Sequence, residues 1–329
     1  MTSVSVIIPT HAREERTRTA LASLRKQDYL HTWEVCVVDN AGSAALAELI
    51  RREAQSFPVP LRCVREPRVG LHHARHAGAL AAIGEVLAYL DDDVLVPAGW
   101  LSALAAPYAD PNVMAVGGKV IPRWEEEPPA WVHDYLNYLS VLDLGEESTE
   151  LRPPQTLHGC NFSVRKTELW AVGGFHPDAF ADRRLIWYRG DGESGLVQEL
   201  LRRGHKVIYE PRAWVYHCIP SSRTTLRYMA RRVADEAITG SYKALRERRY
   251  TAASLLVRAP LTLLRFVKHR LRLLLTREGG PRVQCQLSCS AEWTLFQHRI
   301  RYLASADLRR HIHQETYLIS PDATGVHAR

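Results

Sequence analysis

The chain has 329 residues, of which 46% are hydrophobic, with six cysteines and a formal net charge of +7. This length accommodates one domain of roughly 220 residues and a smaller appendage, and a core of that size needs no disulfides. The cysteines are scattered, and Cys285 and Cys289 lack the second pair that a zinc site requires, so reduced thiols are expected. The sequence shows neither a secretion signal nor an apolar run of membrane-spanning length, which predicts a cytoplasmic protein.

Strand and helix patterns alternate through the first 90 residues. Short apolar runs predict strands at Val4–Thr10, Trp33–Val38, Leu61–Val64 and Val86–Leu90. Apolar residues at helical spacing predict helices after the first three strands, at Glu14–Gln27, Ala44–Gln55 and Leu71–Ile83. This alternation predicts an α/β fold with a mostly parallel, doubly wound sheet whose ligands bind at the carboxyl ends of the strands.

Three consecutive carboxylates, Asp91, Asp92 and Asp93, follow the fourth predicted strand. Adjacent carboxylates repel one another, and a divalent cation with oxygen ligands is the simplest compensation. A surface turn or a helix cap is an equally good interpretation of the triplet alone. Thr10 and Asp39 end two other strands and are expected at the same edge of the sheet, which favours a ligand site.

Four segments in the first half carry a family resemblance, namely Ser5–Thr10, Val37–Asn40, Gly70–Gly78 and Tyr89–Asp93. Later segments continue it in order, namely Gly117–Gly118, His158–Phe162, Gly173–Phe175, Gly190–Glu193, Gly204, Glu210–Pro211 and His217. Together these segments resemble the nucleotide-sugar and acceptor motifs of family 2 glycosyltransferases, which have the Rossmann-like GT-A fold. The resemblance covers residues 3–217, about two-thirds of the chain.

The resemblance implies an inverting enzyme that moves a sugar from a UDP-, dTDP- or GDP-sugar to a hydroxyl group. The acceptor would be a glycan or a lipid-linked molecule, in the synthesis of cell-surface polysaccharide or glycolipid. The implied cofactor is Mg²⁺ or Mn²⁺, which would bridge the phosphates of the donor and take up charge as the nucleoside diphosphate departs.

The resemblance also assigns residues to the donor. Those expected to bind the nucleotide sugar are Pro9, Thr10, Arg13, Asp39, Arg75, Asp91 and Asp92, and those expected to bind the metal are Asp93 and His217. Asp39 would accept a hydrogen bond from the base; it could instead cap the following helix, although Ser43 is better placed for that. Arg75 could be a solvated helix residue and His217 a buried structural histidine. The nearby His72, His73 and His76 are expected to be surface or site-lining residues.

A general base is needed because a sugar hydroxyl is a poor nucleophile until its proton is removed. By the family's register Glu193 is the catalytic carboxylate and Asp191 orients the acceptor, and both precede a predicted helix at Gly195–Arg203. One of the two could cap that helix instead. Gly192 stands where the family usually carries a second acid. The expected acceptor-binding residues are Gly159, Asn161 and Trp131.

Residues 123–154 interrupt the α/β rhythm with several aromatic side chains, which could stack on sugars or form a buried lid helix. After residue 220 the strands stop and helices are predicted at Thr225–Arg248, Ala253–Thr276 and Glu292–Arg310. We therefore expect a GT-A domain at 1–220 and a helical, basic region at 221–329.

Residues 241–280 contain ten Lys or Arg and two Glu. Such a basic amphipathic region predicts contact with an anionic membrane, which would make the enzyme peripheral at the inner face of the cell membrane. The alternative is a helical subdomain with a solvated basic face. No nucleic-acid-binding motif accompanies the charge, so nucleic acid is not an expected partner.

Two other function classes compete with the glycosyltransferase. A sugar nucleotidyltransferase should show a glycine-rich phosphate loop after its first strand, and Pro9–Arg13 contains no glycine. A non-catalytic carbohydrate-binding or membrane-docking protein on a degenerate transferase fold would explain the missing acid at Gly192. Retention of both Asp93 and Glu193 argues for the enzyme.

Overall fold

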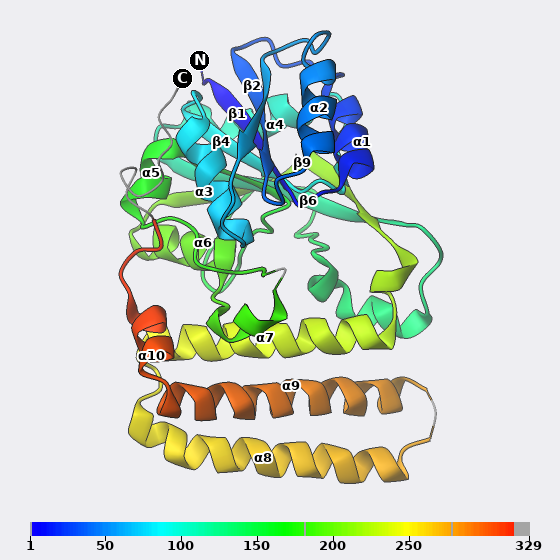
Figure 1. Ribbon diagram of the computed structural model, residues 1–329, viewed down its shortest axis with the longest axis vertical. Helices are drawn as coiled ribbons and strands as arrows, with labels where there is room; N and C mark the ends of the chain where they lie inside the picture. Colours follow the sequence, from blue (N-terminus) through cyan, green and yellow to red (C-terminus); the bar gives the residue numbers. More distant parts are fainter. Residues whose placement is uncertain (1, 181, 278, 319–329) are drawn as a thin grey trace.

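The computed structural model describes residues 2–180, 182–277 and 279–318. It confirms an α/β fold with a mostly parallel sheet and additional C-terminal helices. Among these residues the strand order is β3-β2-β1-β4-β8-β6-β9-β5, with β7 paired to β9. Figure 1 shows the sheet and its helices at one end of the molecule and three long helices, α7, α9 and α8, at the other.

The first half of the sheet is parallel, as the alternating pattern predicted. Its strands are β1 (Val4–Thr10), β2 (Trp33–Asp39), β3 (Leu61–Arg65) and β4 (Val86–Leu90). Every residue of β1, β2 and β4 is buried, which explains why these strands read as continuous apolar runs. The connecting helices are α1 (Glu14–Leu24), α2 (Ala44–Glu53) and α3 (Leu71–Ala81), each two or three residues shorter than predicted.

The second half of the sheet mixes directions. Its strands are β5 (Val94–Leu95), β6 (Val113–Trp124), β7 (Thr149–Glu150), β8 (Asn161–Arg165) and β9 (Lys206–Ile219). β8 runs antiparallel to both β4 and β6, while β6 and β9 are parallel. The pairing of β5 with β9 sets Val94 opposite His217, so the acidic triplet and that histidine lie at one end of the sheet.

Helices cover both faces of the sheet. On one face α1 and α2 share a core with α4 (Trp100–Ala105), and on the other α3 shares a core with α5 (Lys166–Ala171) and α6 (Gly192–Arg202). Short 3-10 helices are η1 (Ala106–Ala109), η2 (Ala130–Leu139), η3 (Arg183–Tyr188) and η4 (Ser221–Arg223).

The aromatic segment at 123–154 contains η2. Trp124, Trp131, Tyr135 and Tyr138 pack around a cluster that joins η2 and the end of β9 to two C-terminal helices. This packing agrees with a helix whose aromatic side chains are partly buried, and it does not exclude the other interpretation, since both could hold at once. Tyr138 also lines a cavity described below.

The C-terminal helices are α7 (Leu226–Arg246), α8 (Ala252–Leu275), α9 (Gly280–Ala304) and α10 (Ala306–His313). The first two lie within two residues of their predicted bounds, whereas α9 begins twelve residues before the predicted Glu292. It packs against α7 on one side and α8 on the other, so its apolar residues form no single stripe from which a helix could be recognised (Figure 1). No helix in the described ranges is long and apolar enough to cross a membrane. A domain division near residue 220 remains our proposal, and residues 319–329 of the second part lie outside the described residues.

Candidate active site

The carboxyl ends of β1 and β4 bring the acidic triplet against Pro9 and Thr10, the last residues of β1. The Thr10 hydroxyl donates to Asp92 Oδ2 at 2.5 Å, and Arg13 Nη1 donates to Asp92 Oδ1 at 3.2 Å. Burial raises the pKa of Asp92, although both of these donors oppose the shift. The sequence prediction that Thr10 and the triplet share one edge of the sheet therefore agrees with the geometry.

A cleft of about 300 Å³ opens at this edge. The residues that line it include Pro9, Thr10, Arg13, Asp91 and Asp92, which the sequence analysis assigned to the donor, and Asp93, which it assigned to the metal. Asn40, next to Asp39, also lines the cleft. Gly70 and Leu71 at the start of α3 and Ala179 and Phe180 complete much of the wall. We refer to this space as the donor cleft.

Asp39 lies beside the donor cleft but does not line it. Its Oδ1 accepts the backbone N–H groups of Ala41 and Gly42 at 3.0 and 2.9 Å, so the carboxylate shapes the turn after β2. Ser43 caps α2 through the N–H of Leu46, as expected. The side chain that lines the cleft here is Asn40.

Asp93 is surrounded by positive charge. Its Oδ2 lies 2.9 Å from Arg223 Nη2 and 3.3 Å from Arg16 Nη1, and its Oδ1 lies 3.5 Å from His217 Nε2. Arg223 Nη1 lies 3.1 Å from the same His217 nitrogen. The two residues predicted to hold a metal are therefore neighbours, with Arg223 touching both.

His217 fits a role as metal ligand. Its Nδ1 lies 2.9 Å from the carbonyl oxygen of Leu139, which can only accept, so Nδ1 carries the proton and Nε2 presents a lone pair toward Asp93 and Arg223. Burial lowers the pKa of His217, which keeps the ring neutral, even though Asp93 opposes the shift. One carboxylate and one imidazole nitrogen suit Mn²⁺ or Mg²⁺ completed by phosphate oxygens and water. No group of three or more His, Cys, Asp or Glu side chains within the described ranges could hold a metal alone.

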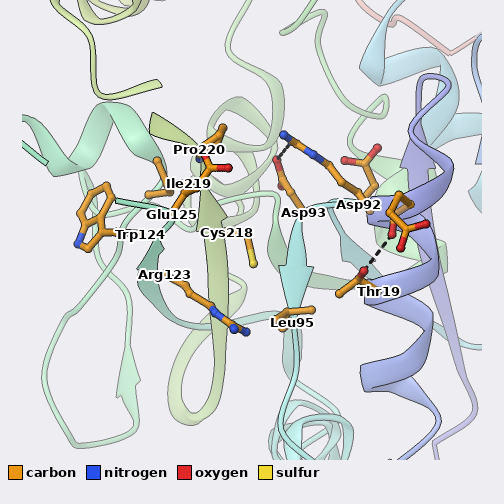
Figure 2. Close-up of a pocket in the computed structure, with 12 residues that line it drawn as sticks. Thr19, Asp92, Asp93, Leu95, Arg123, Trp124, Glu125, Cys218, Ile219 and Pro220 are labelled. Carbon is orange, nitrogen blue, oxygen red and sulfur yellow. Dashed lines mark hydrogen bonds and ion pairs between the residues drawn. The ribbon is translucent and has the colours of Figure 1, made fainter. Parts of the chain in front are cut away.

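A second cavity of about 380 Å³ lies on the other side of Asp92 and Asp93. Figure 2 shows both aspartates at its rim, with Trp124 and Glu125 at one end and Thr19 at the other. The wall also includes Arg16 and Arg123, so cations line both sides of the acidic triplet.

A larger cavity of about 610 Å³ lies between the sheet edge and α7. It shares Leu71, Asp91, Ala179 and Arg223 with the donor cleft, so the two spaces meet at Asp91. Glu193, Asp191 and Gly159 line it, as do Tyr228 and Arg232 of α7. We refer to this space as the acceptor cavity.

Arg75 contacts several carboxylates where the donor cleft and the acceptor cavity meet. Its buried guanidinium donates through Nη1 to Asp178 Oδ2 and to Glu193 Oε2, each at 3.0 Å, and its Nη2 lies 4.0 Å from Asp91 Oδ1. Burial alone would lower the pKa of Arg75, but the surrounding carboxylates raise it, so the group stays charged. Arg75 is thus neither a solvated helix residue nor a lining residue of the donor cleft; it lines the acceptor cavity.

Glu193 is held in the ionised form. Burial would raise its pKa, but Arg75 and the Gly159 N–H, which donates to Oε1 at 2.9 Å, outweigh burial and lower the pKa to about 2. Burial raises the pKa of Asp91 to about 7, since Arg75 offsets only part of the effect and the other two aspartates add to it. Two carboxylates at the junction of the cavities therefore differ strongly in their affinity for a proton.

Asp191 immediately precedes α6, and its Oδ1 lies 2.5 Å from His176 Nδ1. Its side chain makes no capping hydrogen bond to the helix, so the capping interpretation does not hold for it. Glu193 lies in the first turn of α6, and the helix begins at Gly192, three residues before the predicted start.

Two predicted acceptor residues lie away from the acceptor cavity. Asn161 is buried in the sheet, where its Oδ1 accepts from Trp100 Nε1 at 3.0 Å and its Nδ2 donates to the carbonyl oxygens of Ala213 and Lys119. Trp131 packs in the cluster around η2. The prediction that both contact an acceptor does not match these positions, because each side chain is already engaged in packing or structural hydrogen bonds.

The sequence analysis did not single out Asp178, Arg16 or Arg223. Asp178 follows the Gly173-Gly174-Phe175 segment, and Arg223 lies six residues after His217, in η4. Asp178 and Arg223 lie outside the long helices and strands, so no periodic pattern marks them, and Arg16 lies in α1, where helical spacing does not show that it reaches Asp93. His72, His73 and His76 are packed on α3, where His76 Nε2 accepts the N–H of Phe175 at 2.8 Å; none of the three lines the donor cleft or the acceptor cavity.

A carboxylate-rich cleft at the edge of a mostly parallel sheet, joined to a cavity with an ionised glutamate, agrees with what the sequence resemblance implied for a GT-A glycosyltransferase. Residues 5–173, half of the chain, match the sequence profile of glycosyl transferase family 2, and the chain belongs to that family.

Named relatives support this assignment. The glucosyl-dolichyl phosphate glucuronosyltransferase of Haloferax volcanii is 28% identical over 234 residues, 69% of this chain and 72% of that protein. The succinoglycan biosynthesis protein ExoM of Rhizobium meliloti is 24% identical over 70% of this chain and 71% of its own length. The pre-mycofactocin glycosyltransferase of Mycobacterium tuberculosis is 29% identical over 68% of this chain, but only 44% of that longer protein is matched.

Solved structures share the fold. A mannosyltransferase from Pyrobaculum calidifontis, in complex with GDP-Man and Mn²⁺, superposes with a TM-score of 0.55 and 23% identity over 92% of this chain and 74% of that one. GalNAc-T7 with UDP, GalNAc and Mn²⁺ gives a TM-score of 0.51 and 20% identity over 71% of this chain and 48% of that one. At these identities the likeness concerns the fold alone.

Proposed function

We propose that the protein is an inverting glycosyltransferase that moves a sugar from a nucleoside diphosphate sugar in the donor cleft to a hydroxyl group in the acceptor cavity. The observation that carries the proposal is the junction of the two spaces at Asp91, with Glu193 facing the acceptor side. A sugar at that junction would have its leaving diphosphate toward the arginines and its anomeric carbon toward the incoming hydroxyl.

Glu193 is the proposed general base. Its carboxylate takes the acceptor O–H proton as the hydroxyl oxygen forms a bond to the anomeric carbon and the bond from that carbon to the diphosphate oxygen breaks. Because attack and departure occur on opposite sides, the anomeric configuration inverts. Arg75 positions the carboxylate and keeps it ionised, while the Gly159 N–H fixes its other oxygen. Asp191, paired with His176, is the proposed orienter of the acceptor.

Arg13, Arg16 and Arg223 are the proposed partners of the diphosphate. All three contact Asp92 or Asp93 at 2.9–3.3 Å, so they are held near the acidic triplet before any ligand arrives. Guanidinium groups match phosphate oxygens in geometry and charge. Asp93 and His217 would hold Mg²⁺ or Mn²⁺, which when bound would neutralise charge on the departing nucleoside diphosphate.

The nucleobase of the donor and the chemical class of the acceptor are further parts of the proposal. We propose that Asp39 recognises the edge of the base, with a uracil or thymine imide as the preferred partner and GDP-sugars as the alternative. Asn40 holds the adjoining cleft wall, since its amide donates to the carbonyl oxygens of Glu66 and Arg68 and its Oδ1 accepts the Gly70 N–H. The acceptor we propose is a glycan or lipid-linked molecule in polysaccharide or glycolipid synthesis; the names of the Haloferax and Rhizobium relatives support that range.

A hydrolysis screen across UDP-, dTDP- and GDP-sugars with Mn²⁺ tests the proposal. With sugars of one of the three nucleotides, water should replace the acceptor and the enzyme should slowly hydrolyse the donor. Glu193→Gln should suppress that hydrolysis. Tight nucleotide binding with no hydrolysis and no transfer to any offered glycan would instead favour a non-catalytic sugar-binding protein, the alternative that the missing acid at Gly192 keeps open. Membership of the glycosyltransferase family argues against a sugar nucleotidyltransferase.

A further inference from the structure

The outermost helix of the molecule exposes an apolar face. α8 packs against α9, which separates it from α7 and the sheet domain (Figure 1). Leu255, Ala259 and Thr262 are the fully buried residues of α8. On other positions it exposes leucines, among them Leu256, Leu261, Leu264, Leu271, Leu274 and Leu275.

These leucines form one continuous surface. At 3.6 residues per turn they fall within an arc of about 140°, centred opposite the three buried residues. Their exposure is large, with Leu264 at 63%, Leu271 at 57% and Leu275 at 88%. A contiguous apolar face of this kind on a charged protein marks an interaction surface rather than scattered exposed side chains.

The flanks of that face identify its partner. α8 contains five Arg or Lys residues and no Asp or Glu. Arg272 borders the leucine arc on one edge and Arg270 on the other, and Lys268 lies just inside the first edge. All three are exposed, and their long stems let the charged groups reach outward beside an apolar surface. A second copy of the same face is a poor partner, because a symmetric pairing would bring these cationic edges together.

We propose that α8 is a membrane-docking helix whose leucine face lies in the interfacial region of an anionic bilayer while its basic edges contact lipid phosphates. This makes the sequence-based expectation of a basic amphipathic region at an anionic membrane specific to one helix and to its leucine face, where apolar insertion and charge act together. The proposal goes beyond the transfer reaction and does not depend on it, because vesicle binding requires neither donor nor acceptor.

Vesicle flotation of the full chain tests the proposal. Binding is expected to vesicles of mixed phosphatidylcholine and phosphatidylglycerol, and much less to phosphatidylcholine alone. The triple variant Leu264→Ser/Leu271→Ser/Leu275→Ser should weaken binding by roughly a hundredfold, because three apolar side chains no longer leave water. The matched control is Leu30→Ser/Ile83→Ser, which changes two strongly exposed apolar residues outside α8 and should bind like the wild type.

Charge is tested separately. Lys268→Gln/Arg270→Gln/Arg272→Gln should lose about fivefold per charge at low salt and should be less sensitive to added salt than the wild type. All substituted positions are exposed, so the fold should be retained, and unchanged circular dichroism and donor hydrolysis without vesicles should confirm this.

Three results would overturn the inference. One is a wild-type protein that stays unbound with anionic vesicles at low salt, and another is a serine variant that floats as well as the wild type. The third is a wild-type dimer, seen by light scattering, that the serine substitutions dissociate, since the face would then join two copies of the chain.

Discussion

Arg75 Nη1 lies 3.0 Å from both Glu193 Oε2 and Asp178 Oδ2, so one buried guanidinium connects the proposed general base in α6 to a carboxylate of the segment after α5. The three residues come from α3, from the segment after α5 and from α6. Breaking such a buried pair by removing one partner typically costs 3–5 kcal/mol, about as much as the whole margin of a marginal domain. The arrangement therefore links the position of the base to the local fold.

Substituting the base gives the most direct test of the chemistry. Glu193→Gln should lower turnover by roughly 10²–10⁴ while donor affinity stays nearly unchanged, because only proton removal is lost. Asp191→Asn is the matched comparison and should cost less, partly through a higher acceptor KM. Steady-state kinetics with a saturating donor measures both; if the Asp191 variant is dead and the Glu193 variant active, the two roles must be exchanged.

The pKa of Glu193 predicts how activity depends on pH. Because that pKa is lowered to about 2, the base form is present above this value and is lost only as the pH falls through it. Titration of Glu193 should therefore cause no loss of kcat in the wild type between neutral pH and about pH 4.

Removing Arg75 should change that profile. In Arg75→Met the charge that opposes the effect of burial is gone, so the pKa of Glu193 should rise. As the pH is lowered, kcat should therefore begin to fall at a higher pH than in the wild type. Arg75→Lys, which keeps a charge, should restore part of the wild-type profile. Arg232→Met is the control, since Arg232 lines the same cavity and donates to the Tyr138 carbonyl instead of a carboxylate. An unchanged kcat profile in a folded Arg75→Met protein would remove Arg75 from its proposed positioning role.

Gly159 should tolerate no side chain. A Cβ there would lie 2.2 Å from Arg75 Nη2 and 3.0 Å from the Glu193 carboxyl carbon, so Gly159→Ala must displace one or both. We expect a fall in kcat of about tenfold or more, as small displacements of catalytic groups commonly produce. Gly240→Ala in α7, where nothing lies within 4 Å of the added carbon, should leave activity intact and serves as the control. Equal activity of the two variants would contradict the placement of Glu193.

Nucleotide binding should depend on a divalent metal. Calorimetry with UDP or dTDP should show affinity falling by roughly 10–100-fold when EDTA removes Mn²⁺, with Asp93→Asn producing a similar loss that added metal does not repair. Asp143→Asn, at an exposed carboxylate paired with Lys119, should bind like the wild type. Identical affinities with and without EDTA would show that the arginines alone hold the diphosphate.

Asn161 is predicted to stabilise the sheet instead of the acceptor. Asn161→Ala removes the acceptor of Trp100 Nε1 and the donor to the carbonyl oxygens of Lys119 and Ala213, which should cost about 3 kcal/mol or more of unfolding free energy. Thermal denaturation measures the loss, and the acceptor KM of the folded variant should not change. Asn137→Ala, at an exposed residue of the acceptor cavity, should show the opposite pattern, with stability kept and KM raised.

The sheet edge could be predicted from the sequence and the arrangement around Arg75 could not. β1 and β4 are continuous apolar runs ended by Thr10 and Asp91, so their periodicity and order place both at one edge. Arg75 was expected near the nucleotide, but Asp178, 103 residues later, and Glu193 engage its guanidinium. The position of Asn161 differs from the predicted acceptor contact for a related reason. A polar residue in a sequence motif can either face a cavity or donate to buried carbonyl oxygens, and only tertiary contacts decide between the two.

α7 forms one wall of the acceptor cavity and also begins the stack of helices that ends in α8 (Figure 1). With helix axes 8–10 Å apart, two packing steps set the axis of α7 about 16–20 Å above the axis of α8, and the reaction centre lies farther still from the leucine face. If a bilayer bound at the leucine face, α7, α9 and α8 would hold the reaction centre at a fixed distance from the membrane surface. Hydroxyl groups close to a lipid phosphate would then lie below Glu193, the proposed general base, and those at the far end of a growing glycan would reach it. Acceptor length would thus be selected by the thickness of the protein, independently of any contact with the sugar itself.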